Sequence, residues 1–530
     1  MNAQLRRWLR GAVAALVCAS FCACGGGNTS NNGPVLVVAR VKDAVVLDPA
    51  QATDGMSLNI TQEIMKGLVD FKLGGFDVEP AIAQRWTQSS DRRTWTFTLG
   101  PNLRFSDGTP IDAEAVKFNF DRWRLTGSPY HQAYPYAYYA DMFGGYPGLI
   151  ANVAVRGTNT VVFTLTRPFS PFLRDLAMPS FAIASPAAVK ANLAGFGQTP
   201  IGYGPYVLKE WIKDDHITLQ ANPTWRGQRP AYTTVIVRDI PDQATSVLEM
   251  QRGDIDFLTD PRPDDARALA NQRGLIVYDQ PSNNNSYVAM NVQKPPFDKL
   301  AVRQAIAYAI DVRGIVRAFY AKGAVVADNW TPPGMLGANP AVTAYAYDPG
   351  KAKQLLAQAG LAAGFSTNLF YPTTPRPYMP EPQRVAEAIQ AQLRRVGINV
   401  TLEPYEWGVF LDKVRRGEHE MCLIGWSGDN GDPDNFFYPL LDSDSARAKP
   451  NGQNYSFWMD DAFHRLMMAG QTASADGERG QIYRAANAMI HDQAPAVPIV
   501  HTTVPIVVKA SIKGFVPSPD THIAFEYLRP

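Results

Sequence analysis

An acidic, glycine-rich segment follows an apolar stretch near residue 425. It reads GWSGDNGDPDNFF over residues 425–437, and the first of its three aspartates is Asp429. The run from Met421 to Trp426 has the character of a buried strand. Ligands often bind in loops that leave the carboxyl ends of strands in α/β proteins. A carboxylate beside Trp426 suits a small cationic group such as an ammonium, although local chemistry alone also allows a solvated turn.

Sequence motifs for metal binding and catalysis are missing. The seven histidines form no HExxH pattern, and there is no CxxC, GxSxG or GxxxxGK[ST] motif. The acidic run departs from a calcium loop, because its sixth position is Asp434 and its twelfth is Leu440. We therefore predict no metal site, no cofactor and no catalytic residue, and we expect that the protein is not an enzyme.

Strand and helix signals alternate along the chain. Apolar periodicity predicts strands over 36–41, 94–99, 160–166, 398–405 and 420–426, and helices over 56–68, 300–311, 348–360, 382–397 and 407–417. Strand followed by helix followed by strand is typical of an α/β sheet covered on both faces. We expect that Asp432 and Asp434 shape the loop after the last of these strands.

Length and charge limit the class of protein. A chain of 530 residues is too long for a single core, so about three domains are expected. The net charge is +1 and there is no basic stripe, which argues against nucleic-acid binding.

The N-terminus has the composition of an export signal. Basic residues precede an apolar run at 11–21 that is too short to span a membrane. Residues 1–23 are therefore predicted to be a signal peptide, and the polar, Gly-rich stretch 24–34 a flexible tether.

A cysteine follows the predicted signal peptide. Ala23, Cys24 and Gly25 resemble a bacterial lipobox, in which the cysteine is lipidated, although Phe21 and Cys22 depart from the usual pattern. Lipidation of Cys24 would anchor the protein to a membrane, whereas ordinary cleavage would release a soluble periplasmic form.

A single cysteine would remain as a free thiol if Cys24 carries a lipid. It is Cys422, which lies in the apolar run MCLIGW. We interpret Cys422 as a small core residue, and we expect no disulfide framework.

Several longer stretches resemble one family. The chain is similar to the extracytoplasmic solute-binding proteins of bacterial peptide and nickel ABC importers (family 5), and most similar to their dipeptide-binding branch. The stretches are FSDGTPIDAEAVKF (105–118), IGYGPYVL (201–208), PPFDKLAVRQAIAYAID (295–311), RPYMPEP (376–382), YEWG (405–408), GDNGDPDNFF (428–437) and MIHDQAPAVPIVHTTV (489–504). The YEWG and GDNGDPDNFF elements are the most specific.

The resemblance implies an α/β, two-lobed periplasmic-binding-protein fold of type II-like form, with a hinge and an accessory domain. Domain I, the first lobe, is expected at 35–60, 195–278 and 503–530, domain II, the accessory domain, at 61–194, and domain III, the second lobe, at 279–502.

The resemblance also implies a ligand site. The family's aspartate for a peptide ammonium falls on Asp429, and its arginine for the carboxylate falls on Arg376. The residues that line the family's site correspond to Trp407, Tyr378 and Trp426. The backbone of Gly55 and Met56 is also expected to contribute, although the resemblance is weakest there. From the residues alone, Arg376 could be an ordinary surface residue between two prolines, and Trp407 could cap a helix against the core.

This chemistry is adequate for a dipeptide, which carries one charge at each end. The planar fork of an arginine can bond both carboxylate oxygens. Two charge-assisted hydrogen bonds at each end give roughly 6–12 kcal/mol before ordering costs. Micromolar binding requires about 8 kcal/mol.

We therefore expect a monomeric receptor that captures dipeptides outside the cytoplasm and delivers them to an ABC importer permease. The same fold could instead bind longer oligopeptides, heme or a metal chelate. An enzyme or a structural envelope protein is the third and least favoured hypothesis.

Overall fold

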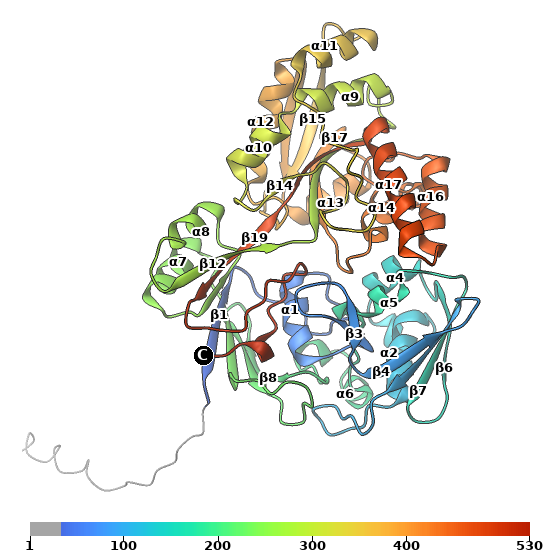
Figure 1. Cartoon of the computed structure of the whole chain (residues 1–530), viewed down its shortest axis with the longest axis vertical. Helices are drawn as coiled ribbons and strands as arrows, with labels where there is room; N and C mark the ends of the chain where they lie inside the picture. The colour runs from blue at the N-terminus through green and yellow to red at the C-terminus, as the bar shows by residue number, and fades with distance from the viewer. Residues whose placement is uncertain (1–32) are drawn as a thin grey trace, which may run out of the picture. The chain divides into compact units, whose positions relative to one another are not determined.

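The computed structural model describes residues 33–530 (Figure 1). The predicted signal peptide (1–23), Cys24 and nearly all of the predicted tether lie outside these residues. Within the described part of the chain, no helix combines the length and the apolar character that crossing a membrane would require.

Four sheets organise the described residues. We call the seven-stranded sheet the first-lobe sheet; its order is β12 (Leu275–Pro281), β19 (Thr503–Lys509), β11 (Phe257–Thr259), β1 (Val35–Arg40), β10 (Thr234–Asp239), β9 (His216–Ala221) and β8 (Tyr206–Ile212). We call the six-stranded sheet the second-lobe sheet; its order is β14 (Val325–Val326), β18 (Ala496–His501), β13 (Asn284–Met290), β17 (Met421–Ser427), β15 (Phe365–Pro372) and β16 (Ile398–Tyr405). The accessory sheet has the order β4 (Ala83–Gln88), β5 (Thr94–Leu99), β7 (Thr160–Leu165) and β6 (Ile150–Val155), and a separate pair joins β2 (Val69–Phe71) to β3 (Val78–Pro80).

The helices lie between and around these sheets. They are α1 (Gly55–Ile64), α2 (Ala113–Arg124), α3 (Pro129–Gln132), α4 (Ala137–Phe143), α5 (Phe172–Leu176), α6 (Pro186–Ala191), α7 (Gln243–Arg252), α8 (Pro263–Leu269), α9 (Leu300–Ala309), α10 (Val312–Phe319), α11 (Pro349–Gln358), α12 (Pro382–Arg394), α13 (Trp407–Arg415), α14 (Asp434–Leu441), α15 (Ser443–Arg447), α16 (Asp461–Thr472) and α17 (Asp476–Gln493), with short 3₁₀ turns η1 (Pro179–Phe181), η2 (Phe196–Gln198) and η3 (Phe525–Tyr527).

Both faces of the second-lobe sheet are covered. Successive residues of β13 alternate between two apolar clusters: Tyr287 and Ala289 pack in one, and Val288 and Met290 pack in the other. Side chains of a strand point to opposite faces in turn, so each cluster lies on its own face of the sheet. All seven residues of β13 are buried. This architecture confirms the α/β prediction.

The strands of the first-lobe sheet come from three separate parts of the chain, around residues 35–40, 206–281 and 503–509. The accessory sheet is built from residues 83–165. These groupings support the domain division expected from the resemblance, which we keep as a proposal.

The chain crosses between the two large sheets twice (Figure 1). β12 ends at Pro281 and β13 begins at Asn284, while β18 ends at His501 and β19 begins at Thr503. Pro281 pairs with Thr503, so the two crossings lie side by side. We call these crossings, residues 282–283 and 502, the hinge.

Most predicted elements are present, although the predicted helices end two to four residues early. The strand over 398–405 and the helix starts at Pro382 and Trp407 match the structure, and Asp348 caps α11 by accepting from Lys351 N. The helix expected over 56–68 ends at Ile64. Gly67 disfavours a continued helix, and residues 202–204 pack against the end of α1.

Candidate functional site

Three loops of the second lobe leave the same edge of its sheet. β13 begins at the hinge, and its first residue, Asn284, pairs with Ser427 at the end of antiparallel β17. β15 runs parallel to both β17 and β16, so all three strands end on the hinge side. Arg376 and Tyr378 follow β15, Trp407 follows β16, and Asp429 follows β17. The strand directions therefore bring these candidates to one edge.

Asp429 is surrounded by protein but lacks a full set of partners. One carboxylate oxygen, Oδ1, accepts from Tyr138 Oη at 3.2 Å. The other, Oδ2, is buried and has no hydrogen-bond partner within residues 33–530. Burial raises the pKa of Asp429 to about 7, the Tyr138 hydrogen bond opposes the rise, and nearby Asp141 adds to it. An ammonium group would supply the missing donor and favour the charged form.

Asn435 connects Asp429 to Trp426. Its Oδ1 accepts from Trp426 Nε1 at 2.9 Å and from the backbone N of Asp429 at 3.3 Å. Trp426 is half-buried against the apolar cluster on this face of the sheet. The indole and the start of the acidic loop are thereby fixed relative to each other.

Arg376 stacks on the aromatic residue that the resemblance assigned to the same site. Its guanidinium carbon lies 4.0 Å from the centre of the Trp407 ring. Arg376 Nε is buried without a partner within residues 33–530, and no ion pair to Arg376 is formed there. Stacking fixes the plane of a guanidinium and leaves its edge available to a carboxylate.

Tyr378 joins the two parts of the site. Burial raises its pKa, and the nearby Arg376 opposes the rise. The Tyr378 ring lies so close to Gly425 of β17 that a Cβ there would come within 2.4 Å of it. Tyr378 therefore fills the space between Arg376 and the strand that leads to Asp429.

The hinge holds the loops that carry both charges. Next to Asp429, Gly428 N donates to Asn283 O at 2.6 Å and Asn283 Nδ2 donates to Gly428 O at 2.9 Å. Next to Arg376, Thr502 Oγ1 donates to Pro377 O at 3.0 Å. The positions of the two charged loops thus depend directly on the hinge.

The rest of the acidic loop is held by ion pairs and hydrogen bonds. Asp432 accepts two bonds from Arg479, at 2.9 and 2.7 Å, and Asp434 accepts from Gln471 at 3.0 Å. These partners give the two acids the loop-shaping role expected of them.

The same loop also contacts the accessory region. Asn430 Nδ2 donates to Asp175 at 2.6 Å, and Arg174 Nη1 donates to Gly431 O at 2.9 Å. The loop with Asp429 therefore lies between the second-lobe sheet and residues 138–175.

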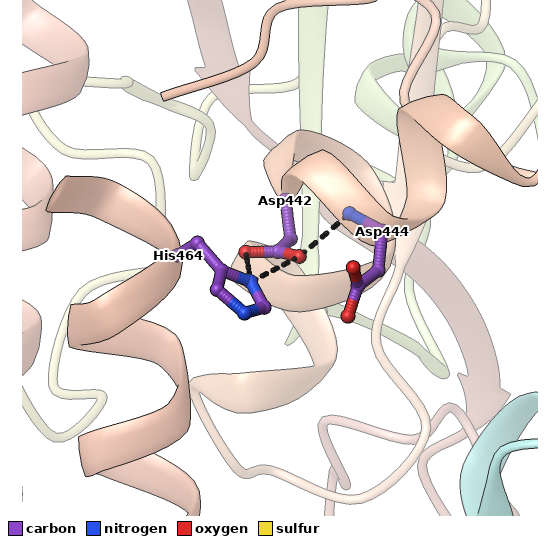
Figure 2. A group of neighbouring side chains, drawn as sticks. All are labelled: Asp442, Asp444 and His464. Atoms are coloured by element: carbon purple, nitrogen blue, oxygen red, sulfur yellow. Dashed lines mark hydrogen bonds and ion pairs between the residues drawn. The ribbon is translucent and has the colours of Figure 1, made fainter. Parts of the chain in front are cut away.

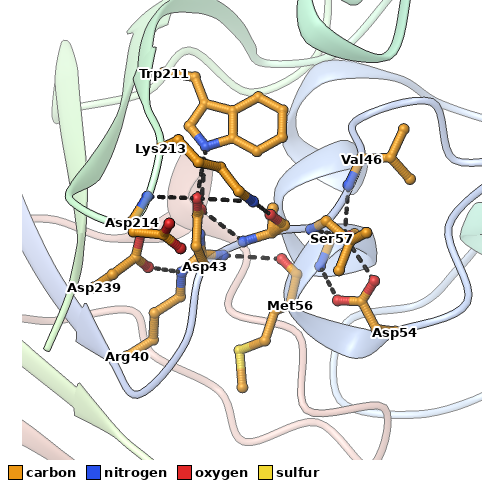
Figure 3. Close-up of polar contacts among 12 residues, drawn as sticks. Arg40, Asp43, Val46, Asp54, Met56, Ser57, Trp211, Lys213, Asp214 and Asp239 are labelled. Atoms are coloured by element: carbon orange, nitrogen blue, oxygen red, sulfur yellow. Dashed lines mark hydrogen bonds and ion pairs between the residues drawn. The ribbon is translucent and has the colours of Figure 1, made fainter. Parts of the chain in front are cut away.

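Gly55 and Met56 form the start of α1, apart from the other candidates. Asp54 caps the helix by accepting from Ser57 N at 2.9 Å, and Arg40 Nη1 donates to Met56 O at 2.9 Å (Figure 3). Among residues 33–530, no hydrogen bond joins Gly55 or Met56 to Asp429 or Arg376.

Electrostatics nevertheless connect α1 to the acidic loop. The pKa of Tyr138 is raised by burial, then by Asp429, and by a smaller contribution from Asp54. The start of α1 is therefore near enough to the Tyr138 hydroxyl to affect its titration.

Four residues of this site were not found from the sequence: Tyr138, Asn283, Asn435 and Thr502. Tyr138 belongs to the aromatic run YAYYADMF, and Asn283 to the polar run SNNNS that enters a strand. Both runs are unusual enough to mark a site, but neither indicates its partner.

One cluster contains residues of the types that bind metals. His464 Nδ1 lies 3.0 and 3.1 Å from the two carboxylate oxygens of Asp442, and Asp442 Oδ1 accepts from Asp444 N at 2.9 Å (Figure 2). Asp444 also contacts Arg447 at 3.3 Å. These hydrogen bonds account for the cluster, so we assign it a structural role.

Comparisons with known proteins identify relatives of this chain. The chain is 38% identical over 465 residues to a dipeptide-binding protein of Escherichia coli (strain K12), covering 85% of this chain and 86% of the relative. It is 33% identical over 513 residues to heme-binding protein A of Haemophilus influenzae, covering 94% and 92%.

A solved structure has the same fold. It is the ABC transporter-associated periplasmic binding protein DppA from Helicobacter pylori in complex with the peptide STSA. The TM-score is 0.83 and the identity 33%, with 94% of this chain and 98% of that chain covered.

The family described as bacterial extracellular solute-binding proteins, family 5 Middle, matches residues 77–447, which is most of the chain. Together with the two-lobed α/β fold, this match shows that the chain belongs to the family 5 solute-binding proteins, which are binding components of transport and not enzymes.

Proposed function

We propose that this protein captures dipeptides by their two charged ends and delivers them to the permease of an ABC importer. Asp429 accepts the α-ammonium, Arg376 binds the α-carboxylate, and Trp407, Tyr378 and Trp426 line the space between them. The backbone at Gly55 and Met56 supplies the first-lobe side.

One observation carries the proposal: two opposite charges at one sheet edge each have a buried polar atom without a partner among residues 33–530. Asp429 Oδ2 and Arg376 Nε are each buried without a hydrogen bond among the described residues. Buried charged groups are costly unless they are paired. A zwitterion whose ends reach both groups would remove both costs at once.

The same arrangement would select length. Asp429 and Arg376 are fixed by hinge residues, through Asn283 and Thr502 respectively. A ligand that is too long or lacks one terminal charge would leave one of the two groups desolvated and unpaired. Tolerance of different side chains would follow, because the termini supply the main interactions.

Export and anchoring complete the proposal. We propose that residues 1–23 direct export and that a lipid on Cys24 retains the protein at a membrane on the periplasmic side. The soluble periplasmic form is the alternative. Mass spectrometry of the mature protein distinguishes them, because only the anchored form carries a lipid on Cys24.

Calorimetry with three peptides tests the proposed recognition. We expect Ala-Ala to bind, Ala-Ala-Ala to bind weakly, and N-acetyl-Ala-Ala not to bind. Acetylation removes the charge that Asp429 recognises while the carboxylate end stays intact. Equal binding of Ala-Ala and its acetylated form would contradict the role of Asp429.

A second ligand class is tested because a relative is named as a heme-binding protein. When heme is mixed with this protein, we expect its absorption spectrum to be the same as that of free heme. A saturable spectral shift that Ala-Ala does not displace would favour the heme alternative.

A further inference from the structure

A small cavity lies in the first lobe beside Met56. The space open to water-sized spheres in this cavity is about 50 Å³. This is more space than a single water needs. Val38, Ile506 and Phe525 are among its apolar walls, and Asp260 and Asn59 are among its polar residues. The end of one extended side chain could replace the water.

The cavity lies at the edge of the first-lobe sheet that faces the hinge. β19 begins at the hinge, and Ile506 near its start pairs with Thr259 at the end of β11. β1 runs parallel to β11, so Arg40 lies at the end of β1 on the same side. Asp260 directly follows β11. The cavity is therefore on the side of the first lobe from which the chain passes to the second lobe.

Arg40, the one cationic residue that lines this cavity, is engaged by groups other than Asp260. Arg40 Nε donates to Asp239 at 2.7 Å, Nη1 donates to Met56 O at 2.9 Å, and Nη2 donates to Asp43 at 2.8 Å (Figure 3). Each guanidinium nitrogen thus donates to another group, and among residues 33–530 no hydrogen bond or ion pair joins Arg40 to Asp260.

The Asp260 carboxylate has no partner of its own. Within residues 33–530 it forms no side-chain hydrogen bond and no ion pair, and only its backbone oxygen accepts a bond, from Gln243. Burial alone raises the pKa of Asp260 to about 6. No charged neighbour contributes to this shift. The carboxylate is thus ionised at neutral pH beside a small cavity, without a compensating charge.

A second acceptor lies on α1. Asn59 follows Met56 by one helical turn and also lines the cavity. Its side chain forms no hydrogen bond within the described part of the chain. A carboxylate and an amide oxygen around a small cavity suit the three donors of a primary ammonium.

We propose that this cavity is a side-chain subsite that selects a basic residue, lysine above all, in the bound dipeptide, with Asp260 as the acceptor for the side-chain cation. The inference rests on the proposed function, because it takes the ligand to lie against Met56. It adds a substrate class: dipeptides with one cationic side chain, whose apolar stem would contact the walls of the cavity.

Calorimetry at pH 7.5 tests the subsite. The ligands are Lys-Ala and Ala-Lys, their neutral counterparts with norleucine in place of lysine, and Ala-Ala. We expect one lysine dipeptide to bind at least about tenfold more tightly than its norleucine counterpart, as a charge-assisted hydrogen bond requires. The readout is the ratio of the two Kd values, so general weakening by a substitution cancels.

The decisive variant is Asp260→Asn. Asp260 has φ +52°, which asparagine also tolerates. We expect this variant to abolish the lysine advantage. Asp264→Asn is the matched control, because Asp264 is an exposed acid of the same lobe that pairs with Arg267. The control should keep the full advantage.

The experiment distinguishes failure of the side-chain subsite from failure of the proposed dipeptide-binding function. If Ala-Ala binds but lysine gives no advantage at either position, the subsite is overturned and the proposed function stands. A lysine advantage that persists in Asp260→Asn also overturns it. If none of the five dipeptides binds, the proposed function fails and the subsite fails with it.

Discussion

At the residue scale, Asp429 lies in surroundings that disfavour its own charge. Its neighbours are Tyr138, which donates one hydrogen bond, and Asp141, which repels it. The pKa of Asp141 is itself raised to about 6 by burial, with Arg415 opposing the rise. Such surroundings are costly in the free protein and become favourable when an ammonium arrives.

Dipeptide binding should therefore depend on pH in a bell shape. Asp429 must be ionised to bind an ammonium, so affinity should fall below pH 7, approaching tenfold per pH unit. Above about pH 8 it should fall again as the ligand ammonium loses its proton. Calorimetry with Ala-Ala from pH 5 to 9 measures both limbs. A flat acidic limb would contradict the assignment of Asp429.

Replacing the charged Asp429 side chain with a neutral one should stabilise the ligand-free protein. When folding raises the pKa of a carboxyl, the folded protein loses stability as the pH rises from the unfolded-state pKa to the folded-state pKa. For Asp429 these pKa values are near 4 and about 7. Asp429→Asn should therefore raise the free energy of unfolding at pH 8 by up to about 4 kcal/mol, because one pKa unit is worth about 1.4 kcal/mol, with no gain at pH 4. Denaturant titration at the two pH values measures this.

The binding consequence of Asp429→Asn has the opposite sign. The variant should lose most affinity for Ala-Ala, because an amide cannot neutralise an ammonium. A variant that is less stable at pH 8, or that binds Ala-Ala normally, would contradict the interpretation.

At the element scale, the hinge determines where the strand-end loops lie. Thr502 Oγ1 donates to Pro377 O and accepts from Asn284 Nδ2 at 2.9 Å. Pro377 directly follows Arg376, so the orientation of the guanidinium depends on a residue of the hinge. Binding is thereby coupled to a residue that need not touch the ligand.

Thr502→Val should weaken binding without removing a ligand contact. The substitution keeps the shape of the side chain and removes the hydroxyl that holds Pro377. The substitution also removes the acceptor of Asn284 Nδ2, which keeps its bond to Ser282 Oγ. Loss of the bond that holds Pro377 is worth about 1 kcal/mol, or about fivefold in Kd. Calorimetry with Ala-Ala measures the change.

The neighbouring residue provides a matched control. Thr503 Oγ1 is buried and has no hydrogen-bond partner among the described residues. Thr503→Val therefore removes a hydroxyl from the next position without breaking a bond, and it should leave Kd unchanged. Equal effects of the two substitutions would contradict the role of Thr502.

At the scale of the whole molecule, the proposed ligand contacts come from parts that are distant in sequence. Asp429 and Arg376 follow strands of the second-lobe sheet, whereas Met56 lies in α1, which follows β1 of the first-lobe sheet. A ligand that touches all of them binds only the assembled molecule. Binding should therefore stabilise the folded protein as a unit.

Ala-Ala should raise the free energy of unfolding by about 2.7 kcal/mol at a concentration one hundred times its Kd. The physical reason is that the ligand binds the folded state and not the unfolded chain. Thermal denaturation with and without ligand measures the shift. N-acetyl-Ala-Ala is the control, and a shift of the same size with it would contradict recognition of the ammonium.

The sequence by itself determined the elements that carry the proposed ligand residues. Apolar periodicity placed α12, β16, α13 and β17, because each covers or forms a buried sheet and therefore repeats at 3.6 or two residues. The resemblance of the segments after β15, β16 and β17 to the family then suggested Arg376, Trp407 and Asp429 as ligand residues. The elements were predictable because their apolar patterns are local and strong.

Only the tertiary structure decided which residues complete the site. Tyr138 reaches Asp429 across 291 positions of the chain, and Thr502 reaches Pro377 across 125. Asp260 is an ordinary acid after a short strand until the fold places it beside a cavity and engages Arg40 elsewhere. Contacts between residues so far apart depend on how the sheets pack, and no local pattern records that packing.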